Sequence, residues 1–195
     1  MKQEPLKLIK TILGLGIIAL LIVVVVFSTQ KLESFIYPIK YAEYVEPYAE
    51  ENDLDPALVY AVIKCESSFK SDAVSSVGAV GLMQITPDTF DWLLTKTGEQ
   101  DRYDTDDLYD PEVNIQYGTY FLKLLLKEFS DVKTAVTAYH AGMGIVGKWL
   151  DDETYSSDGQ TLEEIPYADT SDYVDRVIKT IDKYNTIYDF KEDAK

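Results

Sequence analysis

The chain has 195 residues, of which 27% are charged, and a formal net charge of −16. Residues 1–40 carry five lysines and two acidic residues, a net of +3, so residues 41–195 carry −19. Such an acidic segment is a poor partner for nucleic acid or anionic lipid. The single cysteine excludes an intramolecular disulfide and a thiolate cluster, and the single histidine excludes a zinc site with several imidazoles.

The N-terminal segment is the first predicted element. Thr11–Phe27 is a run of 17 residues without an ionisable side chain, preceded by Lys2, Lys7 and Lys10. A bilayer core needs about 20 apolar residues, and lysines favour the cytoplasmic side. We therefore predict a transmembrane anchor at residues 8–27, with 1–7 in the cytoplasm, an external spacer at 28–40 and the rest of the chain outside.

A cleaved signal peptide is the alternative for this segment. Signal peptides usually have a shorter apolar region that ends at small residues. Here the run is longer, and Ser28–Lys31 contains no such cleavage site. The sequence therefore favours an uncleaved anchor.

Apolar side chains at spacings of three and four predict a mainly α-helical domain over 41–190, with five to seven helices and a short tail at 191–195. Asp55-Pro56, Thr86-Pro87 and Asp110-Pro111 are typical of helix starts. The expected helices surround Tyr41–Tyr48 and Pro56–Glu66, then Pro87–Gly98, Pro111–Phe129, the segment after Asp131 up to Gly142, and Tyr173–Tyr184 behind a Thr170 or Ser171 cap. Lys70–Val80 and Asp151–Ala168 are expected to be loops.

Glu66 lies on the apolar face of its predicted helix, seven residues after Val59, four after Val62 and three after Ile63. Burial and the negative end of the helix dipole both raise a carboxyl pKa, as a general acid requires. The alternative is a helix rotated so that the carboxylate reaches solvent, and this local pattern leaves both open.

Two further segments carry polar groups near glycines. Gly78–Ile85 contains Gln84, whose amide can bind a hydroxyl or another amide. Ala138–Gly142 places Tyr139 beside His140. Taken singly, the first is more typical of a packed turn without a ligand, and a lone histidine is more often a structural residue.

Taken in order, these motifs resemble the catalytic domain of the soluble lytic transglycosylase family. The match covers roughly residues 41–188 and includes Glu66–Phe69, Ala73–Ser75, Gly78–Pro87, Asn114–Phe129, Ala138–Gly142, Ile165–Tyr167 and Tyr173–Val174. The resemblance implies an all-α, lysozyme-like domain.

The resemblance also implies roles for individual residues. Glu66 would be the only acid/base, with a hydrogen bond from Tyr139, and Tyr173 would help to shape the binding groove. The residues expected to contact or orient substrate are Ser67, Gly81, Met83, Gln84, Tyr139, His140, Asp169 and Tyr173. Three positions depart from the family pattern, because His140 replaces the usual Asn, Thr86 the usual Met and Asp169 the usual Glu. These departures bear on substrate contacts and rate more than on the type of reaction.

The implied reaction is cleavage of peptidoglycan glycan strands between N-acetylmuramic acid and N-acetylglucosamine, with a 1,6-anhydro product and no metal or other cofactor. One alternative is a hydrolytic muramidase, similar to goose-type lysozymes, with Asp72 or Asp169 as second carboxylate. Another is a wall-binding module without turnover. Cell-wall or secretion machinery are candidate partners, beside the membrane itself.

Overall fold

The structure is a computed structural model that describes residues 4–129 and 131–190. The chain divides into two compact units, Met1–Pro38 and Ile39–Lys195. The predicted cytoplasmic segment, 1–7, lies partly outside the described residues, and the predicted tail, 191–195, lies wholly outside them.

The first unit contains one helix, α1 (Glu4–Ile36), of 33 residues. Large apolar side chains are exposed along it, including Leu13, Val23 and Phe27. Within the described part of the chain, no helix meets the length and hydropathy needed to cross a bilayer.

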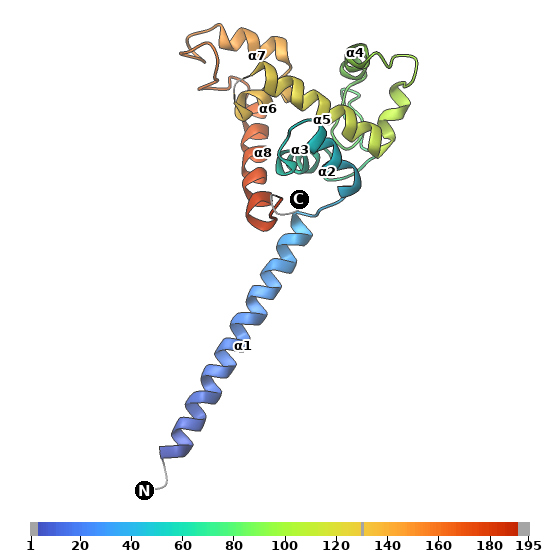
Figure 1. Ribbon diagram of the computed structural model, residues 1–195. Coiled ribbons are helices and arrows are strands. Elements are labelled where there is room, and N and C mark those ends of the chain that lie inside the picture. Colours follow the sequence, from blue (N-terminus) through green and yellow to red (C-terminus); the bar gives the residue numbers. More distant parts are fainter. Residues whose placement is uncertain (1–3, 130, 191–195) are drawn as a thin grey trace. The chain divides into compact units, whose positions relative to one another are not determined.

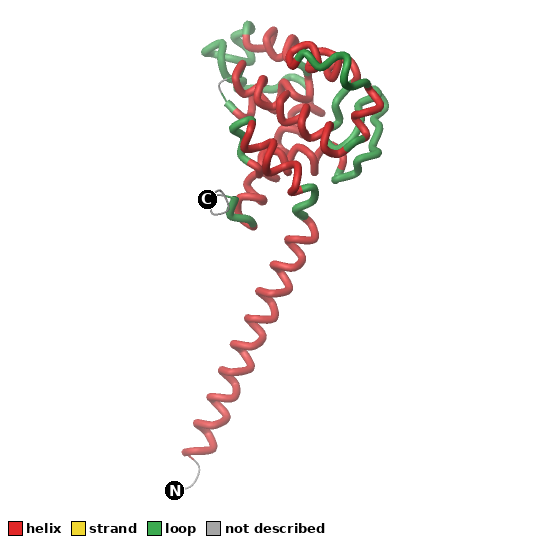
Figure 2. The backbone as a smooth tube through the Cα atoms, turned by 45° about the vertical axis from the view of Figure 1, so that its right-hand side comes forward, coloured by secondary structure: helices red, strands yellow, loops and turns green. Residues whose placement is uncertain are grey.

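The second unit is mainly α-helical, which confirms the predicted class (Figure 1; Figure 2). In the described residues, the only β-structure is a pair of isolated bridges, Val74 with Val80 and Val80 with Ile85. The elements are α2 (Ala42–Glu51), α3 (Pro56–Ser67), α4 (Pro87–Thr97), the 3₁₀ helix η1 (Thr105–Tyr109), α5 (Pro111–Glu128), α6 (Val132–Ala141), α7 (Met143–Leu150) and α8 (Ala168–Ile187).

Most helix starts follow the predicted capping residues. The side chains of Asp55, Thr86, Asp110 and Asp131 accept hydrogen bonds from the first backbone N–H groups of α3, α4, α5 and α6. Each of these acceptors satisfies a donor that a helix start leaves unpaired.

Two elements differ from the prediction. Helix α7 was not expected, because two glycines interrupt its apolar pattern, but it buries Val146 and Trp149. Helix α8 begins at Ala168 behind Tyr167, which has no side-chain cap, and not behind Thr170 or Ser171. Packing of the following helical face therefore sets this start, and a side-chain cap does not.

Helix α3 is the central element of the core (Figure 1). Every residue from Ala57 to Ile63 is buried, and the helix packs against α2 and α8, while α6 packs against α5, α7 and α8. A helix buried on all sides is held by packing more than by helix propensity. This arrangement brings the last turn of α3 close to α6 and α8.

Candidate active site

Glu66 lies in the last turn of α3, one residue before the helix ends. Ser68 and Phe69 then adopt left-handed backbone angles, with φ of 51° and 64°. This conformation is uncommon for residues other than glycine, and here the buried Phe69 ring holds it in place. The turn stops the helix just after Glu66 and leaves its carboxyl group at the junction with α8.

The Glu66 carboxyl group is held by Tyr173 of α8. The Tyr173 hydroxyl donates a hydrogen bond to Glu66 Oε1 at 2.6 Å. Burial raises the pKa of Glu66 from 4.5 to about 7, although the Tyr173 hydrogen bond and the positive charge of Arg176 both act to lower it. A carboxyl group with this pKa can give up or take a proton near neutral pH. The Glu66 side chain is half-buried, and its carboxyl group is sufficiently withdrawn from water to have a raised pKa, so the fully solvated alternative does not hold.

Tyr173 is itself positioned by neighbours on α6 and α8. The His140 ring stacks on it with centroids 4.4 Å apart and planes at 26°, and the Arg176 guanidinium lies 6.0 Å from its ring centroid. His140 Nδ1 lies 3.1 Å from the Thr170 hydroxyl. Burial and Arg176 lower the pKa of His140 while Asp169 opposes them, so the imidazole is mainly neutral at pH 7.

Tyr139 differs from the prediction. Its hydroxyl donates to the carbonyl oxygen of Met83 at 2.6 Å, whereas we expected it to bind Glu66. Its ring packs on Phe121 with centroids 5.2 Å apart. Tyr139 still lies close enough for the charge of Glu66 to contribute to the raised pKa of its hydroxyl. Its direct role is to fix the loop before α4, and Tyr173 is the donor to the acid.

Asn114 of α5 holds the Gly78–Ile85 loop in place through hydrogen bonds. The buried Asn114 amide donates to the carbonyls of Val80 and Leu108 at 3.0 and 2.8 Å, and its Oδ1 accepts from Met83 N at 2.8 Å. Gly81 lies directly against it, since a Cβ there would come within 2.2 Å of Asn114 Nδ2. Only glycine fits such a contact, especially at a φ of 80°.

This packing changes the roles of two predicted substrate contacts. Met83 is completely buried and lies against Gly118, where a Cβ would come within 2.3 Å of the Met83 sulfur. Gly81 is also buried. The structure therefore gives both residues a packing role that sets the shape of the loop.

Gln84 and Ser67 have part of their hydrogen-bonding capacity committed. Gln84, at a φ of 49°, donates both amide N–H groups, to the Ala73 and Gly81 carbonyls at 3.0 Å each. Its Oε1 is the group that can accept from a sugar hydroxyl. The Ser67 hydroxyl is buried and donates to the Ile63 carbonyl within α3 at 3.2 Å. Asp169 is exposed at the start of α8.

Sequence reasoning missed Arg176, Thr170 and Asn114 as parts of this site. Arg176 follows Tyr173 by three residues and so shares its helical face, and it is one of only two arginines in the sequence. That spacing was a usable signal. The contacts of Thr170 and Asn114 join residues 30 and 34 positions apart in the chain, and no local pattern predicts them.

Comparison with known proteins places this geometry in a family. The model of the transglycosylase SLT domain matches residues 43–161. The chain is 31% identical over 144 residues to the soluble lytic murein transglycosylase of Salmonella typhimurium, covering 73% of this chain and 22% of that protein. It is 30% identical over 138 residues to the membrane-bound lytic murein transglycosylase C of Actinobacillus pleuropneumoniae, covering 66% and 38%.

Solved structures agree with the sequence matches. An inactive mutant of lytic transglycosylase Slt from Pseudomonas aeruginosa aligns with a TM-score of 0.66 and 29% identity, over 80% of this chain and 26% of that one. The 70-kDa soluble lytic transglycosylase of Escherichia coli aligns with a TM-score of 0.68 and 26% identity, over 77% and 25%. The chain thus spans between about a fifth and two fifths of the length of these relatives. The chain belongs to the transglycosylase SLT domain family, with its lysozyme-like helical fold.

Proposed function

We propose that this chain is a peptidoglycan lytic transglycosylase with Glu66 as its acid/base. The observation that carries the proposal is the half-buried Glu66 carboxyl group, with a pKa of about 7 and a fixed donor in Tyr173. The relatives described above are named as lytic murein transglycosylases, which supports the same substrate class. The bond cleaved joins N-acetylmuramic acid to N-acetylglucosamine.

The reaction needs one carboxyl group used twice. Protonated Glu66 gives its proton to the glycosidic oxygen, and the bond from that oxygen to the anomeric carbon breaks. The acetamido group of the same sugar stabilises the positive anomeric carbon. The Glu66 carboxylate then takes the proton of the sugar's 6-hydroxyl, whose oxygen bonds to the anomeric carbon and closes the 1,6-anhydro ring. Glu66 ends protonated, and no water is consumed. General acid–base help of this kind contributes about 10²–10⁴-fold.

Substrate contacts belong to the same proposal. Gln84 Oε1 would accept from a sugar hydroxyl, and the exposed His140 and Asp169 lie beside Tyr173, where they would contact a neighbouring sugar. Ser67 would act through its position beside Glu66. Gly81 and Met83 would act by shaping the loop.

A hydrolytic muramidase is the nearest alternative, and it requires a second carboxylate near the acid to activate water. The relatives described above are named as lytic murein transglycosylases, which supports the route with a single carboxyl group. A wall-binding module without turnover would have no use for an acid with a raised pKa.

Mass spectrometry of digested peptidoglycan tests the proposal. We expect 1,6-anhydro-muramic ends from the full chain, and no digestion by Glu66→Gln. Reducing muramic ends would identify a hydrolase instead. No digestion by either protein on several wall types would favour the wall-binding module.

We further propose that residues 8–27 anchor the enzyme in the cell membrane with its catalytic domain outside. The 17-residue run without ionisable groups and the exposed apolar side chains along α1 support this assignment, as does a relative named as membrane-bound. The spacer of about a dozen residues would keep the domain near newly made wall and the machinery there. Alkaline extraction of membranes tests the anchor, because a membrane-spanning protein stays in the membrane fraction. N-terminal sequencing of that protein tests whether the anchor remains uncleaved.

A further inference from the structure

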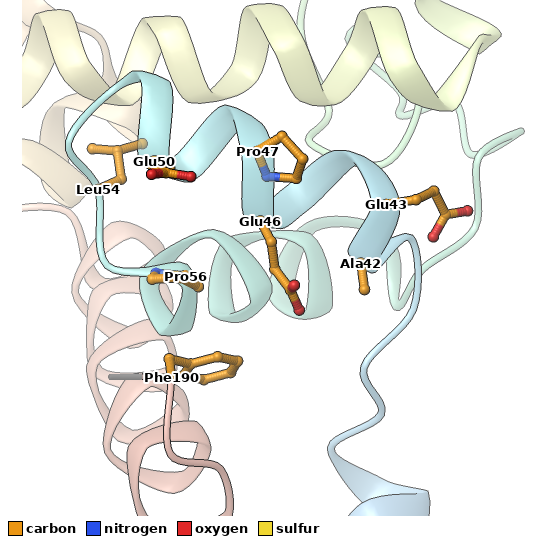
Figure 3. Close-up of a pocket in the computed structure, with 8 residues that line it drawn as sticks. All are labelled: Ala42, Glu43, Glu46, Pro47, Glu50, Leu54, Pro56 and Phe190. Carbon is orange, nitrogen blue, oxygen red and sulfur yellow. The ribbon is translucent and has the colours of Figure 1, made fainter. Parts of the chain in front are cut away.

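A second concave site lies away from Glu66, on the face formed by α2, the start of α3 and the segment after α8 (Figure 3). It is a groove of about 500 Å³. It shares no residue with the candidate active site. The residues that line it are Ala42, Glu43, Glu46, Pro47, Glu50, Leu54, Pro56 and Phe190.

The rim of the groove is acidic. Glu43, Glu46 and Glu50 are exposed and follow one another at spacings of three and four along α2, which places them on one helical face. Like charges at this spacing repel one another, and the last turn of α2 contains no basic residue. Pro47 has no N–H, so it cannot donate to the Glu43 carbonyl, which is left as a further acceptor. The rim therefore presents acceptors and negative charge.

The floor of the groove is apolar. Pro56 and the Phe190 ring lie on the side of α2 toward which Glu46 points, Leu54 lies beside Glu50, and Pro47 adds an exposed apolar surface on α2 itself (Figure 3). Such a surface is stabilised when another apolar group covers it. A ligand for this groove therefore needs both positive charge and apolar surface.

Below the floor lies the fully buried side chain of Tyr60, which does not itself line the groove. Its ring stacks on Phe190 with centroids 5.6 Å apart. Burial raises the pKa of the Tyr60 hydroxyl, and the charge of Glu46 and a hydrogen-bonding interaction with it raise the pKa further. Tyr60 therefore supports the floor from within the core and is not itself a contact for a ligand.

We infer that this groove binds a cationic, amphipathic segment of a partner protein, with lysine or arginine side chains against Glu43, Glu46 and Glu50 and an apolar side chain against Leu54 and Phe190. The sign of the charge disfavours nucleic acid and anionic lipid as occupants. A partner helix with basic residues at the same three- and four-residue spacing would match the rim along its length. The apolar floor favours such a segment over an isolated amine.

A binding experiment on the full chain in detergent tests this inference. The probe is a labelled helical peptide with lysines at every third or fourth position and leucines between them, and its counterpart has glutamates in place of the lysines. The triple variant Glu43→Gln, Glu46→Gln, Glu50→Gln removes the rim charge with little change in shape. The matched control, Asp88→Asn, Asp91→Asn, Glu128→Gln, removes the same charge from exposed positions outside the groove.

We expect saturable binding of the lysine peptide, weakened about tenfold in the rim variant and less than about twofold in the control. Phe190→Ala should weaken it as well, and a photoreactive leucine in the peptide should crosslink to residues 42–56 or 190. Equal weakening in the rim and control variants would mean that net charge alone attracts the peptide, and would overturn the site. If a lysine-containing wall peptide bound in a rim-dependent way and the helical probe did not bind, the inference that the occupant is a segment of a partner protein would be overturned. Digestion of peptidoglycan should be unchanged in the rim variant. A failure of the binding proposal can therefore be distinguished from a failure of the proposed function.

Discussion

Two glutamates in this chain receive the same hydrogen bond and have opposite pKa shifts. Tyr173 donates to Glu66 at 2.6 Å, and Tyr117 donates to Glu99 at 2.6 Å. The pKa of Glu66 is raised to about 7, whereas that of Glu99 is lowered, chiefly by the Tyr117 hydrogen bond. The tyrosine lowers the pKa in both places, so the difference comes from the surroundings of each carboxyl group.

Both glutamates are half-buried, and the difference between the two sites is how far each carboxyl group is desolvated. Glu66 lies between the end of α3 and α8, where removal from water raises its pKa by more than Tyr173 and Arg176 lower it. Glu99 lies near the surface between α4 and η1 and also pairs with Arg102 at 2.7 Å. In this chain, the tyrosine–glutamate pair with the stronger desolvation has the raised pKa that an acid/base needs, and the other pair does not.

The largest expected effect is on activity. Glu66→Gln keeps the shape of the side chain but removes the proton that is transferred, so peptidoglycan digestion should fall by about 10²–10⁴-fold or more. Glu99→Gln is the matched control, since it alters an equally short tyrosine hydrogen bond at a half-buried site away from Glu66, and it should digest at nearly the rate of the unmodified chain. Similar losses in both variants would show that the fold, and not proton transfer, was affected.

The second effect is on stability, with its sign set by burial. Between about pH 4.5 and 7 the folded chain holds a proton on Glu66 that the unfolded chain has lost, so the Glu66 contribution to stability falls as pH rises through this window. Glutamine does not ionise. Glu66→Gln should therefore be more stable than the unmodified chain at about pH 8, by roughly 2–3 kcal/mol, and the gap should close below about pH 4.

Urea unfolding at several pH values measures this gap as the difference in free energy of unfolding. A constant difference across the pH range would mean that the pKa of Glu66 is not raised. Exposed Asp88→Asn serves as the control and should show no such trend.

The third effect is a shift in pH dependence. Tyr173→Phe removes the hydrogen bond that lowers the Glu66 pKa while keeping the ring that stacks on His140. The pKa of Glu66 should rise further, by roughly one unit, and the alkaline limb of kcat/KM should move to higher pH by the same amount. We expect digestion at neutral pH to fall about tenfold, because the carboxyl group loses its orientation. A lower rate with an unmoved limb would give Tyr173 a purely structural role.

Local patterns predicted much of this site. The spacing of Glu66 from Val59, Val62 and Ile63 placed it on the buried face of α3, and the capping residues marked most helix starts. Both depend on residues within about two turns of each other, where helical geometry fixes which side chains are neighbours.

Contacts between helices were harder to predict. The sequence motif made Tyr139 the expected partner of Glu66, but Tyr173 fills that place, 107 residues along the chain, and Tyr139 binds Met83. Both tyrosines reach the same region, so the choice depends on how α8 packs on α3 and α6 packs on α8. The roles of Gly81 and Gly118 likewise depend on distances across the fold, to Asn114 and Met83.

The smallest expected effect is on the stability of Glu99→Gln. The pKa of Glu99 is lowered in the folded chain, so its contribution to stability is present above the unfolded pKa and is lost as the pH falls through the lower, folded value. Glu99→Gln should therefore be less stable than the unmodified chain at neutral pH, by less than about 1 kcal/mol because solvent and salt screen the exposed Arg102 pair. The difference should shrink in acid and at high salt. When Glu66→Gln and Glu99→Gln are unfolded side by side at neutral pH, the free energy of unfolding should rise in the first variant and fall in the second, although the two hydrogen bonds have equal length. Changes of the same sign would contradict burial as the deciding factor.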